Sequence, residues 1–288
     1  HSDHEDKKIL YILLKKAILR FYKDYQFNIN LIAKIKIKNH ISKLFFYKFG
    51  FDLILKDKKN IYLKKSAFCR NSIISKKSVG VIIQARQTSQ RLPNKVLKTI
   101  NGSSIIELLL ARLVRSKMTN KMIVAIPKNQ KNNKLFNNLK IIKADIYRGS
   151  EKNVLKRYFD AAKKNKIRMI VRITSDCPLL DYKLLDKIIN FAINSDVDYA
   201  SNTKPATLPK GFSIEVFKYA ALKNSLIHAK KNYQKEHVNY YIHENKNFTR
   251  SNFYLKNMNF SSKNFSIDSM NDLRFVTSIF KKFLPNIH

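Results

Sequence analysis

The sequence is poor in cysteine, tryptophan, glycine and proline, and these shortages exclude several classes of protein. Its 288 residues include 2 Cys, no Trp, 5 Gly and 6 Pro. The two cysteines, Cys69 and Cys177, are far apart and predict neither a disulfide framework nor a zinc site. A reducing, cytoplasmic setting is therefore expected. The low glycine and proline content excludes collagen-like and linker-rich chains.

Long hydrophobic runs are also missing. The longest apolar stretches, such as residues 105–114, are too short and too interrupted to cross a bilayer. No secretory signal pattern opens the sequence, so neither secretion nor membrane insertion is expected. Hydrophobic residues still make up 44% of the chain, which is enough to form the core of a globular protein.

Acidic residues are scarce beside basic ones. The chain has 57 Lys and Arg against 20 Asp and Glu, which gives a formal net charge of +37. Such a charge favours binding to nucleic acid or to an anionic surface. The excess is mostly lysine and is spread along the whole chain, whereas a binding footprint requires clustering. A polyanion site and a compositional bias without function both stay open, and we expect no specific nucleic-acid partner.

Strand and helix patterns alternate from Val79 onward. Strands are predicted at residues 79–85, 121–126, 141–147 and 168–174, and helices at residues 105–113, 151–164 and 181–193. Ser103 or Ser104 is expected to cap the first of these helices. Repeated strand–helix units predict an α/β fold with a doubly wound, mostly parallel sheet. Such sheets bind ligands beyond the C-terminal ends of their strands.

Residues 1–78 show a different pattern and are predicted to form a separate segment ahead of a domain at 79–288. Helical spacing is present at residues 10–21 and 41–49, and strand character at residues 27–37. Residues 51–55 and 61–63 predict a hairpin, and the basic residues from 64 to 78 a linker.

The loop after the first strand of the domain concentrates cations and hydroxyl groups. Arg86, Arg91 and Lys95 follow the strand, together with Thr88 and Ser89. A triphosphate requires several fixed cations and hydrogen-bond donors in place of its water and counterions, so this loop predicts a phosphate site. The alternative is an ordinary solvated basic loop in a lysine-rich chain.

Seven motifs follow one another between about residues 79 and 284. They cover residues 84–97, 148–157, 172–179, 198–202, 210–217, 236–238 and 268–272. In this order they resemble the motifs of sugar-activating cytidylyltransferases. The nearest match is the family of spore coat polysaccharide biosynthesis protein F, related to CMP-N-acetylneuraminate and CMP-KDO synthetases. Seven motifs in order are far more specific than a single short pattern.

This resemblance implies a nucleotide-diphospho-sugar transferase fold and an enzyme that joins CTP to a sugar or sugar acid. The products would be a CMP-sugar and pyrophosphate, with Mg²⁺ as cofactor and a homodimer as one allowed assembly. The resemblance implies a nucleotide site made of Gln84, Ala85, Arg86, Ser89, Arg91, Lys95, Arg148, Ser150, Arg172 and Asp176. Catalytic roles would fall to Arg86, Lys95 and Asp176, substrate binding to Asn202, Lys210, Glu215 and His237, and Mg²⁺ binding to Asp176 and Asp268.

The metal pair also follows from chemistry. Asp176 and Asp268 each come after an apolar segment, so we expect both at one sheet edge, where two carboxylates and phosphate oxygens can hold Mg²⁺. The alternative for Asp176 is a turn or helix cap before Pro178, and for Asp268 a cap of a helix from Asn271.

Other candidate site residues have structural alternatives as well. Ser150 and Glu151 could cap a helix, and His237 could be an exposed helical histidine. Cys177 is interpreted as a small buried side chain, because no motif supplies a base for a nucleophilic thiol.

The chain departs from the family pattern at four positions. Asn94 and Ser175 replace glycines that the family often has, and Asn153 and Ser213 replace acids. Asn94 is a mild change, because asparagine tolerates left-handed backbone. Ser175, beside a metal-ligand candidate, and Ser213 are larger changes, so a catalytically impaired scaffold protein of a glycan pathway remains an alternative function.

A second resemblance falls in the first 78 residues. Residues 39–51 resemble the asparagine–serine–aromatic–Gly-Phe stretch near the end of GNAT-type N-acetyltransferases. The Gly-rich pyrophosphate loop expected ahead of it has no glycine here, at residues 4–10. We therefore expect a partial acetyltransferase-like segment without activity.

Overall fold

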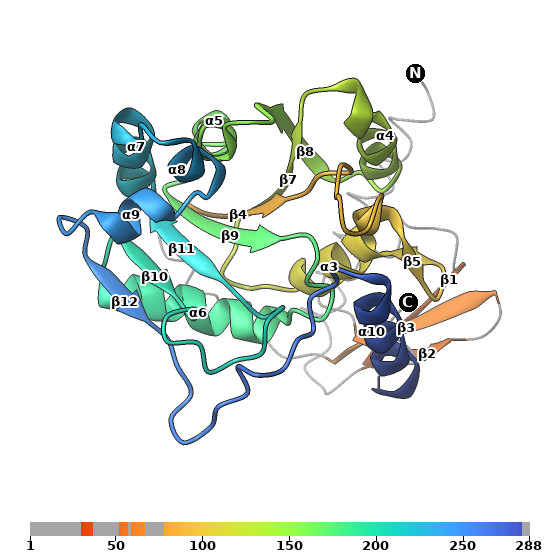
Figure 1. Cartoon of the computed structure of the whole chain (residues 1–288). Helices are drawn as coiled ribbons and strands as arrows, with labels where there is room; N and C mark the ends of the chain where they lie inside the picture. The colour runs from red at the N-terminus through yellow and green to blue at the C-terminus, as the bar shows by residue number, and fades with distance from the viewer. Residues whose placement is uncertain (1–29, 37–51, 57–58, 67–77, 284–288) are drawn as a thin grey trace, which may run out of the picture.

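The computed structural model describes residues 30–36, 52–56, 59–66 and 78–283 (Figure 1). The first three strands are β1 (Asn30–Lys36), β2 (Asp52–Lys56) and β3 (Asn60–Ser66). They pair antiparallel in the order β1-β3-β2, so the predicted strand near 27–37 and the predicted hairpin are both confirmed. The whole of the acetyltransferase-like stretch, residues 39–51, lies outside the described residues, as does Cys69.

A seven-stranded sheet with the order β12-β10-β11-β9-β4-β7-β8 forms the centre of the rest of the chain. Its strands are β4 (Val79–Gln84), β7 (Lys121–Pro127), β8 (Asp145–Gly149), β9 (Met169–Thr174), β10 (Tyr199–Ser201), β11 (Glu215–Lys218) and β12 (Arg250–Asn252). Strands β8, β7, β4 and β9 run parallel, whereas β11 is antiparallel to both of its neighbours. The sheet is therefore mostly parallel, as predicted.

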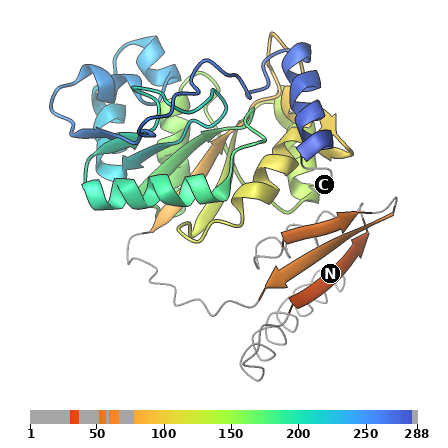
Figure 2. The same ribbon diagram turned by 90° about the horizontal axis from the view of Figure 1, so that it is seen from below.

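Helices cover both faces of this sheet (Figures 1 and 2). The longer ones are α3 (Ile105–Leu113), α4 (Asn133–Ile141), α5 (Val154–Lys164), α6 (Tyr182–Ser195), α7 (Tyr219–His228) and α10 (Met270–Phe283), and the short ones α8 (Asn232–Glu236) and α9 (Tyr240–Glu244). Buried residues of α3, α4 and α6 form one core cluster, and those of α5 and α7 a second. Strand β4 reads VGVIIQ because helices bury it on both sides.

Two local predictions were wrong at their boundaries. The strand expected at 141–147 starts later, at Asp145, because residues 133–141 form α4. This helix is rich in asparagine, and its only fully buried residues are Leu135 and Leu139, so its apolar signal is short. The helix expected from Glu151 begins at Val154, where the Asn153 side chain caps it by accepting a hydrogen bond from the Lys156 N–H.

Helix α10 packs beside α3. Its Leu273, Val276 and Phe280 pack with Leu92, Ile267 and residues of α3 in a third core cluster. This packing anchors the segment that carries Asp268 against the segment that carries Lys95. Among the described residues, no helix is both long and apolar enough to span a membrane.

Candidate active site

The loop between β4 and the short 3-10 helix η1 (Lys95–Leu97) lies at the C-terminal edge of the parallel strands. Asn94 has a left-handed backbone with φ of 56°, so the prediction that asparagine can replace glycine here is confirmed. Its Oδ1 accepts a hydrogen bond of 2.8 Å from Gln87 Nε2, which stabilises this conformation. The turn places Lys95 over the edge of the sheet.

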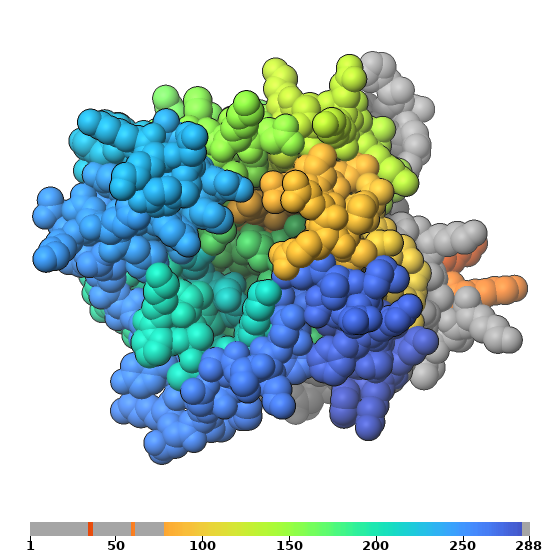
Figure 3. All heavy atoms as spheres, viewed as in Figure 1, coloured from red at the N-terminus to blue at the C-terminus, as the bar shows by residue number. Residues whose placement is uncertain are grey.

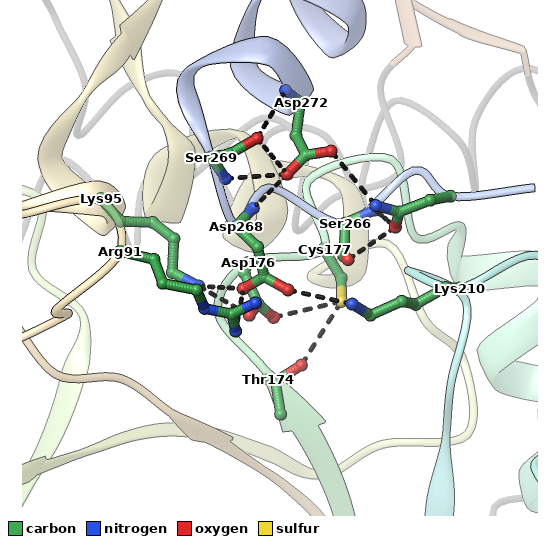
Figure 4. Close-up of polar contacts among 11 residues, drawn as sticks. Arg91, Lys95, Thr174, Asp176, Cys177, Lys210, Ser266, Asp268, Ser269 and Asp272 are labelled. Carbon is green, nitrogen blue, oxygen red and sulfur yellow. Dashed lines mark hydrogen bonds and ion pairs between the residues drawn. The ribbon is translucent and has the colours of Figure 1, made fainter.

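Three cations and two carboxylates meet at this edge (Figure 4). Lys95 Nζ lies 2.9 Å from Asp176 Oδ2 and 3.0 Å from Asp268 Oδ1. Arg91 Nη2 is 3.2 Å from Asp268 Oδ1, and Lys210 Nζ is 3.0 Å from Asp268 Oδ2. Because both carboxylate oxygens contact one nitrogen, the predicted Asp176–Asp268 pair does lie at one point.

Asp268 reaches this point by a route that the sequence did not indicate. The residues before it form no strand; instead, the Ile267 N–H donates a 2.9 Å hydrogen bond to the Asp176 carbonyl. The predicted capping role of Asp268 is also wrong, because Asp272 and Ser269 bond each other at the start of α10. The Asp268 side chain is therefore left for the cations.

The charges of this cluster stabilise one another. Burial alone would raise the pKa of Asp268, but hydrogen bonds from Lys210 and Lys95 lower it to about 2. Burial likewise opposes ionisation of Asp176, yet Lys95 holds the pKa of this carboxyl below its usual value. Burial lowers the pKa of Lys95 less than Asp176 and Asp268 raise it. Both carboxylates are thus ionised and Lys95 is charged at neutral pH.

Two residues beside Asp176 complete its surroundings. Cys177 Sγ lies 3.4 Å from Asp176 Oδ1 and 3.4 Å from Thr174 Oγ1. The Cys177 side chain is buried in the main core. Burial raises the pKa of the Cys177 thiol, as expected for a small buried side chain without a nucleophilic role. Ser175, which replaces a family glycine, has no positive φ and therefore needs no glycine.

The surface at this edge is hollowed (Figure 3). The loop after β4, in orange, borders the hollow on one side, and the light-blue segment of α7 to α9 borders it on the other. A pocket of about 170 Å³ lies nearby, lined among others by Asn202, Lys210, Phe212, Ser213 and Ser261.

The other predicted nucleotide residues take different positions. Arg86 is exposed and makes no hydrogen bond or ion pair with the described residues, so its guanidinium can meet a ligand. Arg148 instead donates to the Asn129 carbonyl and to Asn133 Oδ1, and its guanidinium lies over the Phe136 ring. In this structure Arg148 therefore ties β8 to the start of α4.

Ser150 stabilises the turn that precedes α5. Its Oγ accepts a 3.0 Å hydrogen bond from the Asn153 N–H, but Asn153 itself caps the helix, so the capping alternative for Ser150 is wrong. Glu151 does not belong to the first turn of α5, and its Oε2 accepts a hydrogen bond from Asn129 Nδ2.

The predicted substrate residues are partly engaged by the fold itself. Asn202 is buried, donates to the Phe212 carbonyl at 2.7 Å and accepts from the Ile214 N–H at 2.8 Å, so it closes the loop that lines the pocket. Glu215 and Arg172 are buried against each other in an ion pair. His237 is exposed and its ring lies 4.9 Å from that of Tyr240.

A hydrogen-bonded network holds the loop after β4 and was missed at the sequence level. The buried Asn132 accepts from the Gln87 N–H at 2.8 Å, and Gln87 Oε1 accepts from the Leu135 N–H at the start of α4. Asn132 Nδ2 continues the network to Asn129. These bonds join residues more than forty positions apart, and no sequence motif marks them.

Comparison with known proteins agrees with this geometry. The sequence pattern described as "Cytidylyltransferase" matches residues 80–280. The chain belongs to the cytidylyltransferase family. This cytidylyltransferase is 31% identical over 179 residues to the spore coat polysaccharide biosynthesis protein SpsF of Bacillus subtilis. The aligned residues cover 60% of this chain and 72% of that protein. It is also 42% identical over 175 residues to an uncharacterized protein of Methanocaldococcus jannaschii, over 61% of this chain and 70% of that one.

Solved structures show the same fold. A cytidylyltransferase from Leptospira borgpetersenii is 29% identical, with a TM-score of 0.70 over 74% of this chain and 90% of that one. A CMP-2-keto-3-deoxy-manno-octonic acid synthetase solved with CTP is 12% identical, with a TM-score of 0.57 over 72% of this chain and 99% of that one. The predicted nucleotidyltransferase fold is thereby confirmed, and the chain is an enzyme of the cytidylyltransferase class.

Proposed function

We propose that this cytidylyltransferase transfers CMP from CTP to a hydroxyl of a sugar or sugar acid and releases pyrophosphate, as a step in surface glycan synthesis. The observation that carries the proposal is the meeting of Arg91, Lys95 and Lys210 with Asp176 and Asp268 at the ligand-binding edge of the sheet. The name of the Bacillus subtilis relative supports the polysaccharide context. The CTP complex of the structural neighbour supports the choice of nucleotide.

In this proposal the loop after β4 binds the triphosphate. Arg86 and Arg91 have exposed side chains, and Lys95 sits at the carboxylate pair. Charge-assisted hydrogen bonds from such cations replace the water and counterions of a phosphate chain. Lys95, Arg91 and Lys210 together outweigh the charge of the two carboxylates, so a negatively charged substrate can approach them.

The carboxylate pair suits Mg²⁺. Two ionised oxygens face one point that a cation, the Lys95 ammonium, already occupies, and hard oxygen ligands are those that Mg²⁺ prefers. Asp176 and Asp268 would hold the ion together with phosphate oxygens and water. When bound, Mg²⁺ would neutralise charge on the α-phosphate during attack by the sugar hydroxyl.

We place the acceptor in the pocket beside Lys210. The cation of Lys210, the hydroxyls of Ser213 and Ser261 and the loop closed by Asn202 suit a hydroxylated, anionic ligand. Serine at position 213 supplies a neutral hydroxyl here where the family often has an acid, which favours a sugar acid over a neutral sugar. Glu215 supports this region from the interior of the protein, and His237 is the remaining candidate contact with the acceptor.

We also propose that residues 79–288 form the catalytic domain and that residues 1–78 form a separate, partial acetyltransferase-like segment. The described strands agree with this division, because β1, β2 and β3 pair only with one another.

Pyrophosphate release tests the activity directly. The purified chain is incubated with Mg²⁺ and each of CTP, UTP, ATP and GTP, across a panel of sugar acids and neutral sugars. We expect release with CTP and at least one acceptor. Selective release with another nucleotide, or none with any acceptor, would contradict the proposal.

Arg91→Ala is expected to weaken the use of CTP by about 1–3 kcal/mol, the range for one charge-assisted contact. The Arg91 side chain is 72% exposed and supports no core packing, so the fold should be unaffected. CTP affinity and pyrophosphate release report the effect. Arg274→Ala, which removes the same charge from an exposed residue of α10, is the matched control. Unchanged CTP affinity in Arg91→Ala would remove Arg91 from the phosphate site.

A further inference from the structure

A chain of hydrogen bonds crosses three neighbouring strands near the edge of the sheet where β4 ends and the antiparallel strand β11 begins. Arg172 of β9 donates from Nη1 to Glu215 Oε2 of β11, and from Nη2 to Gln84 Oε1 of β4 at 3.4 Å. Glu215 is only 4% exposed. Its Oε1 accepts further bonds from Asn239 Nδ2 and, at 2.7 Å, from the Tyr199 hydroxyl. Every oxygen of this buried carboxylate is therefore satisfied, and Arg172 is held in one position.

The position of Arg172 decides how the Gln84 amide is oriented. A guanidinium only donates hydrogen bonds, so the amide atom facing it must be the oxygen. The NH₂ group of Gln84 consequently points to the other side. Within the described part of the chain, Gln84 Nε2 has no hydrogen-bond partner. It is also not fully buried, so a ligand can reach it.

Gln84 also lies at the edge where the substrates are proposed to bind. Its carbonyl accepts a 3.1 Å hydrogen bond from the N–H of Ser175, the residue before Asp176. Two positions further along the chain stands Arg86, whose guanidinium is exposed. Gln84 therefore lies beside the segment of Asp176 and close in the chain to the exposed Arg86, at the edge of the sheet where the proposed substrates bind.

We infer that Gln84 is a specificity-determining residue whose NH₂ group donates a hydrogen bond to an acceptor atom of a bound substrate, and that Arg172, held by Glu215, is the positioning residue that fixes this orientation. This inference rests on the proposed function. The family resemblance implies only that Gln84 and Arg172 belong to the nucleotide site; the inference gives Gln84 a specific donor role and Arg172 an indirect, positioning one. The acceptor atom belongs either to CTP or to the sugar acid. Both share the same chemistry, and the two arms of the experiment distinguish them.

Two variants of Gln84 isolate the donor. Gln84→Glu keeps an oxygen for Arg172 and replaces the NH₂ group by a second oxygen, whereas Gln84→Met removes both polar atoms without adding charge. Both variants are expected to bind the substrate that accepts the Gln84 hydrogen bond about tenfold or more weakly, because they leave its acceptor atom unpaired. Gln130→Met, at an exposed residue of η2 (Gln130–Asn132), is the matched control.

The measurements are the Kd of CTP without acceptor and the KM of the acceptor at saturating CTP, each with a melting temperature. A higher Kd of CTP identifies CTP as the ligand of Gln84. A higher KM of the acceptor with an unchanged Kd of CTP identifies the acceptor as the ligand. A loss in Gln84→Glu alone would show a charge effect and overturn the inference, as would no loss in either variant. If the wild type neither binds nor turns over CTP, the proposed function itself fails, which is a different result.

A double-mutant cycle tests the role of Arg172. Arg172→Lys keeps a positive charge near Glu215 but lacks the planar fork that reaches two partners. We expect it to weaken the same affinity, and the further loss from Gln84→Met in this background to be smaller than in the wild type. Fully additive losses would show that Arg172 and Gln84 contribute to affinity independently, which would overturn the role of Arg172 as the residue that orients Gln84.

Discussion

Asp176→Asn is expected to lower the turnover number with CTP by about two orders of magnitude, with a smaller effect on the KM of the sugar. Asparagine keeps the shape of the side chain and removes its charge. Lys95 then keeps only one carboxylate partner, Asp268 Oδ1 at 3.0 Å, and a Mg²⁺ site would lose one of its two charged ligands. Because this charge matters most as negative charge develops on the α-phosphate, turnover is more affected than binding.

Steady-state pyrophosphate release at varied CTP and acceptor concentrations measures both constants. Asp181→Asn is the matched control. The Asp181 side chain caps α6, a role that asparagine fills equally well, and Asp181 makes no contact with the cation cluster. A turnover number for Asp176→Asn near that of the wild type would remove Asp176 from the catalytic site.

Glu215→Ala is expected to lower the free energy of unfolding by about 3–5 kcal/mol, because it leaves the Arg172 guanidinium buried without a counter-charge. Burial alone would raise the pKa of Glu215, but Arg172, Tyr199 and Asn239 hold it below the usual value of a carboxyl group. The carboxylate is thus ionised and satisfied in the folded protein. Its removal also leaves the Tyr199 hydroxyl without its partner.

Urea denaturation measures this loss, with the midpoint and the slope both recorded. Adding Arg172→Met to Glu215→Ala should recover much of the lost stability, since no unpaired charge then remains buried. Lys156→Ala, which breaks the exposed ion pair with Asp160, should cost under about 1 kcal/mol and serves as a control. A double variant no more stable than Glu215→Ala would show that the unpaired charge is not the cause.

The sequence alone determined the elements that depend on local patterns. The buried run at β4 predicted a parallel strand, and Ser103 or Ser104 is expected to cap α3; the structure shows that Ser104 does so, in a capping box with Glu107. Asn94 adopts the left-handed backbone that its chemistry allows. The order of the motifs indicated the family, and the sequence predicts that the carboxylates of Asp176 and Asp268 lie together, as their shared contact with Lys95 shows.

Only the tertiary structure decided which of the predicted side chains meet at the edge of the sheet and which are engaged by the fold. Local periodicity carries no information on side-chain direction across strands, so Arg148 could not be separated from Arg86 until the contacts with Asn129 and Asn133 were seen. Asn239 reaches Glu215 from the N-cap position of the short helix α9, which has no apolar period. Asp268 arrives on an irregular segment whose position depends on one backbone hydrogen bond to Asp176 and on the packing of α10. The motifs predicted candidate site residues, whereas the orientation of their side chains follows from long-range packing that no local pattern encodes.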